Sequence, residues 1–133
     1  MPASGPMAVA AEIVVVGATH RSASGLVREL LATEERELPA LDRRLRAAGI
    51  GQYLWLSTCD RVEIHAVHDD PAAVHSTVAG LFAERAGLTP AMIEPQLYLL
   101  TGRAAVRHAF AVACSLDSQV VGEPHVLGQV KAA

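Results

Sequence analysis

The chain has 133 residues and a formal net charge of −3, with 11 basic and 14 acidic side chains. This length suits one domain. The charge balance is not that of a general nucleic-acid binder. All basic residues except Lys131 are arginines, however, so a local contact of arginines with RNA stays open. No apolar run reaches the roughly 18 residues of a membrane span, and no signal peptide is recognised. Two cysteines are too few for a disulfide framework, so we expect a cytoplasmic protein.

The first third of the chain predicts a leader, one strand and two helices. We expect residues 1–11 to be a disordered leader and the apolar run of 12–17 to be a short buried strand. A helix over 25–31 is expected to place Leu26, Leu30 and Leu31 on one side. A second helix is expected to begin at Thr33, as an N-cap followed by two acidic residues, and to end before Gly49.

The middle of the chain predicts a hairpin. Strands are expected over 52–57 and 61–68, and only Thr58-Cys59-Asp60 separates them, which is typical of a tight antiparallel turn. The second strand alternates Val62, Ile64 and Ala66 with Glu63, His65 and Val67. This alternation predicts one buried and one exposed face.

The remaining elements complete a recognisable order. A helix over 71–86, with Asp70 as N-cap, precedes a strand over 96–100. The resulting β-α-β-β-α-β order predicts an α+β fold with a ferredoxin-like split βαβ sheet. Additional C-terminal helices are expected over 102–114 and from Pro124 onward.

Cys59 is the first candidate for chemistry because it lies at the tip of the hairpin. From the residues alone two interpretations stay open. A free cysteine is often a small buried apolar residue. Alternatively Cys59 is a nucleophile, because a neighbouring cation such as Arg61 stabilises a thiolate, whereas the carboxylate of Asp60 disfavours it.

The helix over 102–114 contains the second cysteine and a candidate histidine. Its apolar stripe is expected to consist of Val106, Phe110 and Ala113, and Cys114 is expected to pack in the core. His108 is offset from that stripe, so it faces either a cleft or the solvent.

Other histidines do not predict a metal site. His65 and His68 fall on opposite faces of one strand, and His75 lies in a helix, so we expect no bound metal. The sequence also lacks a Gly-x-Gly-x-x-Gly turn after a strand and a phosphate-binding Gly-x-x-x-x-Gly-Lys loop. This chain itself therefore offers no nucleotide-binding cradle.

Three segments together resemble a known family. They are Gly17–Ala23 (GATHRSA), Leu56–Ile64 (LSTCDRVEI) and Ser115–Lys131 (SLDSQVVGEPHVLGQVK). In this order and spacing they are similar to the N-terminal catalytic domain of glutamyl-tRNA reductase. The resemblance assigns residues 12–133 to that domain.

The resemblance implies a reaction and a set of residues. In the family a cysteine attacks the ester carbonyl of glutamyl-tRNA to form a thioester, and hydride from NADPH then releases glutamate-1-semialdehyde for tetrapyrrole biosynthesis. Cys59 matches the nucleophile, His108 matches a histidine that assists the acyl step, and Arg61 matches the residue that binds the substrate carboxylate. Further substrate-pocket positions are Thr58, Asp60, Ser118, Glu123, Pro124, His125 and Gln129.

The resemblance also implies partners and a cofactor. NADPH is expected to bind a domain that this chain lacks, the full-length enzyme is expected to be a homodimer, and glutamate-1-semialdehyde aminomutase is a candidate partner. The chain departs from the family pattern at Asp60, where asparagine is usual, and at His125, where glutamine is usual. These departures keep an alternative open, in which the chain is a non-catalytic module that binds glutamyl-tRNA or a partner.

Overall fold

A computed structural model describes residues 11–119, with side chains as far as residue 114. The expected leader, apart from Ala11, and the expected helix from Pro124 lie outside the described residues and stay predictions. Within residues 11–119, no helix is both long and apolar enough to cross a membrane.

The centre of the fold is a four-stranded antiparallel sheet. Its strands are β1 (Glu12–Thr19), β2 (Tyr53–Ser57), β3 (Arg61–His68) and β4 (Tyr98–Thr101). They lie in the order β2-β3-β1-β4, and every neighbouring pair is antiparallel. The α+β class is thereby confirmed, and the strand order agrees with a split βαβ arrangement.

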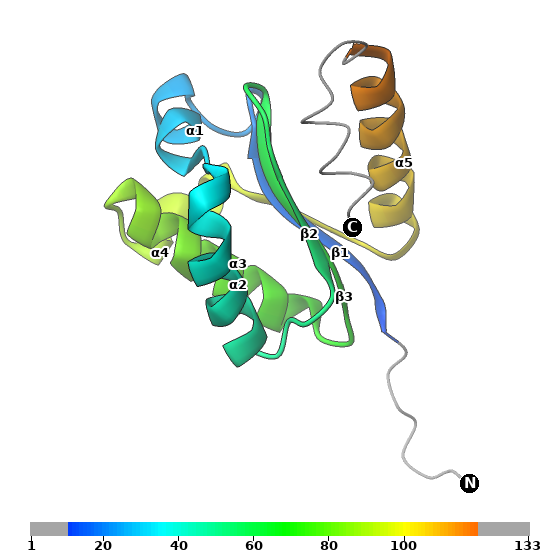
Figure 1. Ribbon diagram of the computed structural model, residues 1–133, viewed down its shortest axis with the longest axis horizontal. Coiled ribbons are helices and arrows are strands. Elements are labelled where there is room, and N and C mark those ends of the chain that lie inside the picture. Colours follow the sequence, from blue (N-terminus) through cyan, green and yellow to red (C-terminus); the bar gives the residue numbers. More distant parts are fainter. Residues whose placement is uncertain (1–10, 120–133) are drawn as a thin grey trace, which may run out of the picture.

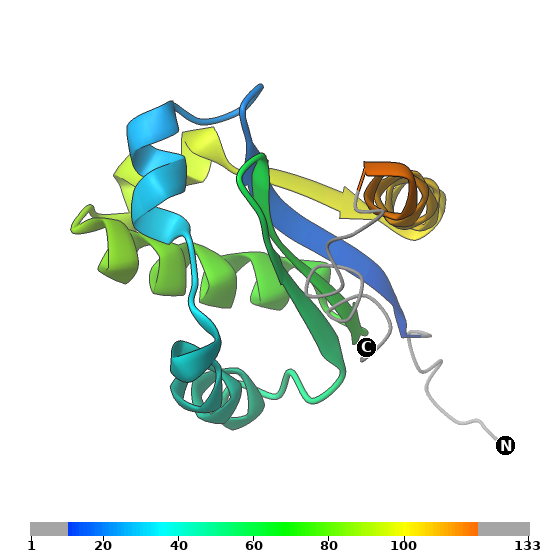
Figure 2. The same ribbon diagram turned by 45° about the horizontal axis from the view of Figure 1, so that its top comes forward.

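Helices cover both faces of this sheet (Figures 1 and 2). One face carries α1 (Gly25–Leu31), α2 (Leu38–Ala47), α3 (Pro71–Ala86) and α4 (Pro90–Ile93), and the other carries α5 (Gly102–Gln119), the single helix there among residues 11–119. Short 3-10 turns occupy Glu35–Glu37 and Glu94–Gln96. The two faces therefore differ in how deeply they are covered.

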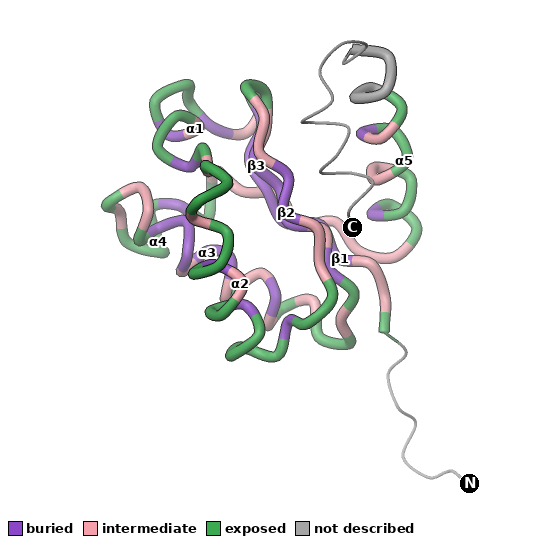
Figure 3. The backbone as a smooth tube through the Cα atoms, viewed as in Figure 1, coloured by how far each residue is buried: buried purple, intermediate pink, exposed green. Residues whose placement is uncertain are grey.

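The main apolar core lies between the sheet and helices α1 to α4 (Figure 3). Val16 of β1 and Ile64 of β3 are fully buried there, and the rings of Trp55 and Phe82 meet edge to face at 5.9 Å. The set Val62, Ile64 and Ala66 points into this core, as the alternation predicted.

The burial within α1 differs along its leucines, and the expected N-cap of the second helix was wrong. In α1 the buried residues are Val27 and Leu31, whereas Leu26 and Leu30 are exposed. Thr33 does not cap a helix, because its backbone N–H donates to Ser57 Oγ at 3.0 Å instead. The chain turns first through the 3-10 turn, whose Glu34 and Glu37 form a capping box.

The second face of β3 is also covered, which the alternation did not predict. Glu63 is completely buried, and His65 is nearly so, because α5 packs over this face of the sheet. Strand β1 is buried on both faces for the same reason. A buried charged residue such as Glu63 needs hydrogen-bonding or oppositely charged partners. These partners of Glu63 define the candidate site.

Candidate functional site

The hairpin tip between β2 and β3 is held by the side chain of Thr58. The Thr58 hydroxyl accepts from the backbone N–H groups of Asp60 at 3.2 Å and Arg61 at 3.3 Å. The Thr58 N–H donates to the carbonyl of Arg61 at 2.8 Å. These bonds close the turn and confirm the tight antiparallel hairpin.

Cys59 is exposed at this tip, so the interpretation as a buried apolar residue is wrong. Its carbonyl accepts a hydrogen bond of 3.1 Å from Nη1 of Arg28 on α1. The turn and the first helix therefore hold the Cys59 backbone from two sides, while the thiol faces solvent. Such a thiol is accessible to a large substrate.

Asp60 and Arg61 differ in their surroundings. The Asp60 side chain is exposed, and within residues 11–114 its carboxylate makes no ion pair. Arg61 is three-quarters buried and pairs with Glu63, at 3.4 Å from Nη1 to Oε2. The Arg61 guanidinium is thus held beside the buried Glu63 carboxylate on the same strand.

Glu63 joins four side chains under α5. Its Oε1 lies 2.8 Å from Nε2 of His65, and its Oε2 lies 2.6 Å from Nε2 of His108. The Tyr98 hydroxyl also donates to Oε2. The Glu63 carboxylate therefore links Arg61, which is the first residue of β3, to His108 on α5.

The strand register explains how these groups meet. Arg61, Glu63 and His65 alternate onto one face of β3. Gly17 of β1 pairs with Glu63 on one side and with Tyr98 of β4 on the other. Because Gly17 has no side chain, the Tyr98 hydroxyl reaches across it to the carboxylate.

The environment of Glu63 controls its ionisation. Burial by itself raises the pKa of this carboxyl, but the hydrogen bonds from His65, Tyr98 and His108, together with the charge on His108, outweigh burial and lower the pKa to about 2. Burial and the neighbouring Glu63 charge raise the pKa of Tyr98. Glu63 is therefore an anion and Tyr98 a hydrogen-bond donor at neutral pH.

Helix α5 carries His108 on the face that meets the sheet, which corrects the predicted apolar stripe. The residues turned toward the sheet are Ala105, His108, Ala109 and Val112, at helical spacing. Val106 and Phe110 are exposed instead, and Cys114 is exposed rather than packed in the core. Small alanines allow α5 to approach the sheet closely, so the apolar bulk of Phe110 was a misleading signal.

Sequence reasoning missed Glu63, His65 and Tyr98 as members of one cluster. His65 was compared with His68 and His75, whereas its partner in space is His108, with ring centroids 6.1 Å apart. A signal was present, since Glu63 lies two residues from both Arg61 and His65 in an alternating strand. What could not be seen was the helix that buries them.

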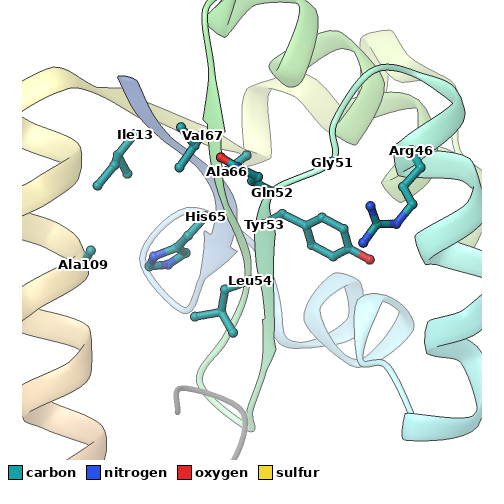
Figure 4. Close-up of a pocket in the computed structure, with 10 residues that line it drawn as sticks. All are labelled: Ile13, Arg46, Gly51, Gln52, Tyr53, Leu54, His65, Ala66, Val67 and Ala109. Atoms are coloured by element: carbon teal, nitrogen blue, oxygen red, sulfur yellow. The ribbon is translucent and has the colours of Figure 1, made fainter. Parts of the chain in front are cut away.

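An open pocket of about 610 Å³ adjoins this cluster where β2 begins (Figure 4). His65 and Leu54 point to the α5 side of the sheet, beside Ala109, whereas Tyr53 points to the opposite side, toward Arg46. The Tyr53 hydroxyl donates to Asp42. Burial and this contact raise the pKa of Tyr53 to about 12. The pocket gives His65 an opening to solvent.

The remaining predicted site residues are only partly placed. Within residues 11–114 no hydrogen bond joins Cys59 to His108. Glu63 contacts both His108 and Arg61, and Arg61 lies two residues after Cys59 in the chain. Ser118 lies in the last turn of α5, and its side chain is not described. Glu123, Pro124, His125 and Gln129 lie outside the described residues.

Comparisons with known proteins identify the family of the chain. Residues 16–133 match the family described as glutamyl-tRNAGlu reductase, N-terminal domain. Glutamyl-tRNA reductases of Rhodospirillum rubrum and Geobacter metallireducens are 42% and 43% identical, over 90% and 91% of this chain. The solved glutamyl-tRNA reductase from Methanopyrus kandleri is 30% identical, covers 90% of this chain and superposes with a TM-score of 0.57.

The chain is short relative to these proteins. It spans 28% of the length of both bacterial relatives and 26% of the solved chain.

Proposed function

This chain belongs to the family of glutamyl-tRNA reductase N-terminal domains, and we propose that it performs the acyl-transfer step of that enzyme, with glutamyl-tRNA as substrate. Cys59 Sγ attacks the ester carbonyl carbon. A carbon–sulfur bond forms, the ester carbon–oxygen bond breaks, and the tRNA leaves with its ribose hydroxyl. The exposure of Cys59 at a rigidly held hairpin tip is the observation that carries the proposal.

His108 serves this step as a proton carrier. In the tautomer that donates from Nε2 to Glu63, Nδ1 is the free acceptor of the imidazole. It takes the thiol proton and returns it to the leaving ribose oxygen. Since general acid–base assistance contributes about 10²- to 10⁴-fold, His108→Asn is expected to slow acyl transfer by about that factor.

Arg61 binds the carboxylate of the glutamyl group in this proposal. A guanidinium matches a carboxylate in two parallel hydrogen bonds. Arg61 is anchored to Glu63 on one side yet keeps a quarter of its side chain exposed. It is therefore oriented by the protein and still open to a ligand.

The described residues do not fit the dinucleotide cofactor of a reductase. Between residues 11 and 119 all neighbouring strands are antiparallel, and the sequence has no glycine-rich turn from a strand into a helix. We assign NADPH binding and the reduction that yields glutamate-1-semialdehyde, on the route to tetrapyrroles, to another part of the enzyme. The homodimer and the aminomutase partner stay predictions.

The proposal is tested by incubating the chain with radiolabelled glutamyl-tRNA. The wild type and Cys114→Ser are expected to form a covalent glutamyl adduct that hydroxylamine releases, whereas Cys59→Ser is not. Cys114 is the matched control because it is also an exposed thiol. The absence of adduct from the wild type, or an equal adduct on Cys59→Ser, would contradict the proposal.

Asp60 supports a second candidate, a module that binds glutamyl-tRNA without reacting. Asp60 follows Cys59 directly in the turn where the family usually has asparagine, and within residues 11–114 its exposed carboxylate makes no ion pair. Alkylation of Cys59 near pH 7, measured in a Cys114→Ser background, separates the two. A rate no faster than that of a free thiol of pKa about 8.5 favours the binding module, and a faster rate favours the nucleophile.

A further inference from the structure

We propose that Glu63, His65 and His108 form a binding site for a divalent transition-metal ion, with Zn²⁺ as the best match. Their ligand atoms, one from each residue, all lie within 4.8 Å of one another. The three residues come from β3, which pairs with β1, and from α5, which packs against β1 and β4. The cluster is therefore assembled before any ion arrives.

The distances suit a small ion. Each imidazole Nε2 lies 2.6–2.8 Å from its own oxygen of the Glu63 carboxylate. Ligand atoms around a tetrahedral Zn²⁺, with bonds of about 2.0–2.1 Å, are roughly 3.3 Å apart. Each Nε2 is closer than this to its own carboxylate oxygen, and the three ligand atoms together lie within 4.8 Å, so shifts of the order of an ångström bring them to the spacing around the ion.

The donor set selects the metal. Two imidazole nitrogens and one carboxylate oxygen form the His₂Glu set that binds Zn²⁺ with a fourth position open. Imidazole ligands favour Zn²⁺, Ni²⁺ and Cu²⁺ over Mg²⁺ and Ca²⁺. Each imidazole that binds through Nε2 keeps its proton on Nδ1, so the ion replaces two N–H···O hydrogen bonds without leaving the histidines charged.

The surroundings of the cluster affect affinity in opposite directions. The Tyr98 hydroxyl donates to the Glu63 carboxylate and orients it, as outer hydrogen bonds do around metal ligands. Arg61 lies 3.4 Å from Glu63 and opposes a second positive charge. The pocket beside His65 provides the entry path from solvent.

Metal binding has a consequence for the proposed acyl transfer, and this part rests on the proposed function. An ion on Nε2 of His108 forces the proton onto Nδ1, the nitrogen that the acyl step needs as an acceptor. Zn²⁺ at this site therefore inhibits acyl transfer. The binding itself does not depend on the reaction.

The test is calorimetric titration of the metal-free chain with ZnCl₂, in a Cys59→Ser, Cys114→Ser background that removes both thiolates as ligands. We expect one ion per chain, and His65→Asn and His108→Asn are each expected to weaken binding at least tenfold, since even outer partners of a metal site contribute about 10- to 100-fold. His75→Asn is the matched control, because His75 lies on α3 across the sheet. It is expected to bind like the parent.

A second readout guards against unfolded variants. Bound Zn²⁺ is expected to raise the midpoint of thermal unfolding of the parent and of His75→Asn, and not of the other two variants, each of which is checked for native circular dichroism. CoCl₂ is expected to give the intense visible absorption of a four-coordinate site. No binding, or equal binding by His65→Asn and the parent, overturns the proposal and leaves a purely structural hydrogen-bond network.

Inhibition is tested separately on chains with intact Cys59. Zn²⁺ is expected to slow adduct formation in the wild type far more than in His65→Asn, each relative to its own metal-free rate. Equal slowing identifies Cys59 as the metal ligand and contradicts inhibition through the cluster. If no adduct forms even in the absence of metal, the acyl-transfer proposal fails, and this outcome is distinct from a failure of metal binding.

Discussion

Gly17 on β1 lies directly opposite Glu63 on β3, and a methyl group at position 17 would come within 2.6 Å of Glu63 Cγ and 2.7 Å of the Val62 carbonyl oxygen. Backbone atoms are part of this contact, so rotation of one side chain does not relieve it. The first glycine of the segment that resembles the family is therefore explained by the space that the buried carboxylate needs.

Gly17→Ala is expected to destabilise the fold and to displace Glu63. Overpacking of this kind costs about 1–3 kcal/mol in the free energy of unfolding, measured by urea denaturation. Gly80→Ala is the matched control, because nothing lies within 4 Å of its added methyl and Gly80 is inside α3. Alanine there is expected to stabilise by up to about 1 kcal/mol. Equal stability of Gly17→Ala and wild type would refute the packing argument.

Glu63→Gln is expected to lower stability by about 3 kcal/mol, because removing one member of a buried ionic cluster leaves the others without their partner. The control is Glu84→Gln, whose ion pair with Arg44 is mostly exposed. That exposed pair is expected to contribute far less to stability, because solvent screens its charges. Urea denaturation of both variants measures the difference, and similar losses would show that burial of Glu63 does not matter.

Arg28→Gln is expected to slow the reaction of Cys59 more than it affects folding. The lost bond to the Cys59 carbonyl is exposed, so stability changes little, but the hairpin tip gains freedom. Misplacement by 1 Å can cost about a hundredfold in rate, and we expect a loss on the order of tenfold in adduct formation. Arg36→Gln, on an exposed turn, is the control, and identical rates for the two variants would remove Arg28 from the site.

Alkaline titration is expected to show no tyrosine ionising near the ordinary value of 10.0, because both tyrosines have raised pKa values in the folded state. Tyr53 is expected to ionise near pH 12, and Tyr53→Phe removes that step from the ultraviolet absorption of tyrosinate. A raised folded pKa stabilises the fold fully below pH 10, and this contribution is lost as the pH rises toward 12. Tyrosinate absorption at the ordinary pH in native protein would contradict the burial of both rings.

The strands and most helices could be predicted because local patterns determine them. The bounds of β3, α1 and α3 agree with the sequence, since alternation, the Asp70 cap and Gly87 act within a few residues. The burial of Glu63 could not be predicted, because it depends on α5, which meets the sheet forty residues later in the chain. The predicted apolar stripe of α5 was wrong for a related reason, since bulky Phe110 suggested the wrong face for a helix that packs through alanines.

The candidate site residues divide in the same way, into those that lie close together in the chain and those that only the fold brings together. Thr58, Cys59 and Arg61 could be singled out because they lie within one short segment that also resembles the family. The cluster that links Arg61 to His108 was missed because its members come from two strands and one helix, β3, β4 and α5. Long-range register, rather than motif, brings them together.

Peptide mapping of the trapped glutamyl group tests the central claim most directly. The chain is incubated with glutamyl-tRNA, quenched in acid, digested and analysed by mass spectrometry. The glutamyl mass is expected on the peptide that contains Cys59 and absent from the peptide that contains Cys114, although both thiols are exposed. A glutamyl group on Cys114, on both cysteines equally, or on neither would contradict the assignment of Cys59 as the nucleophile.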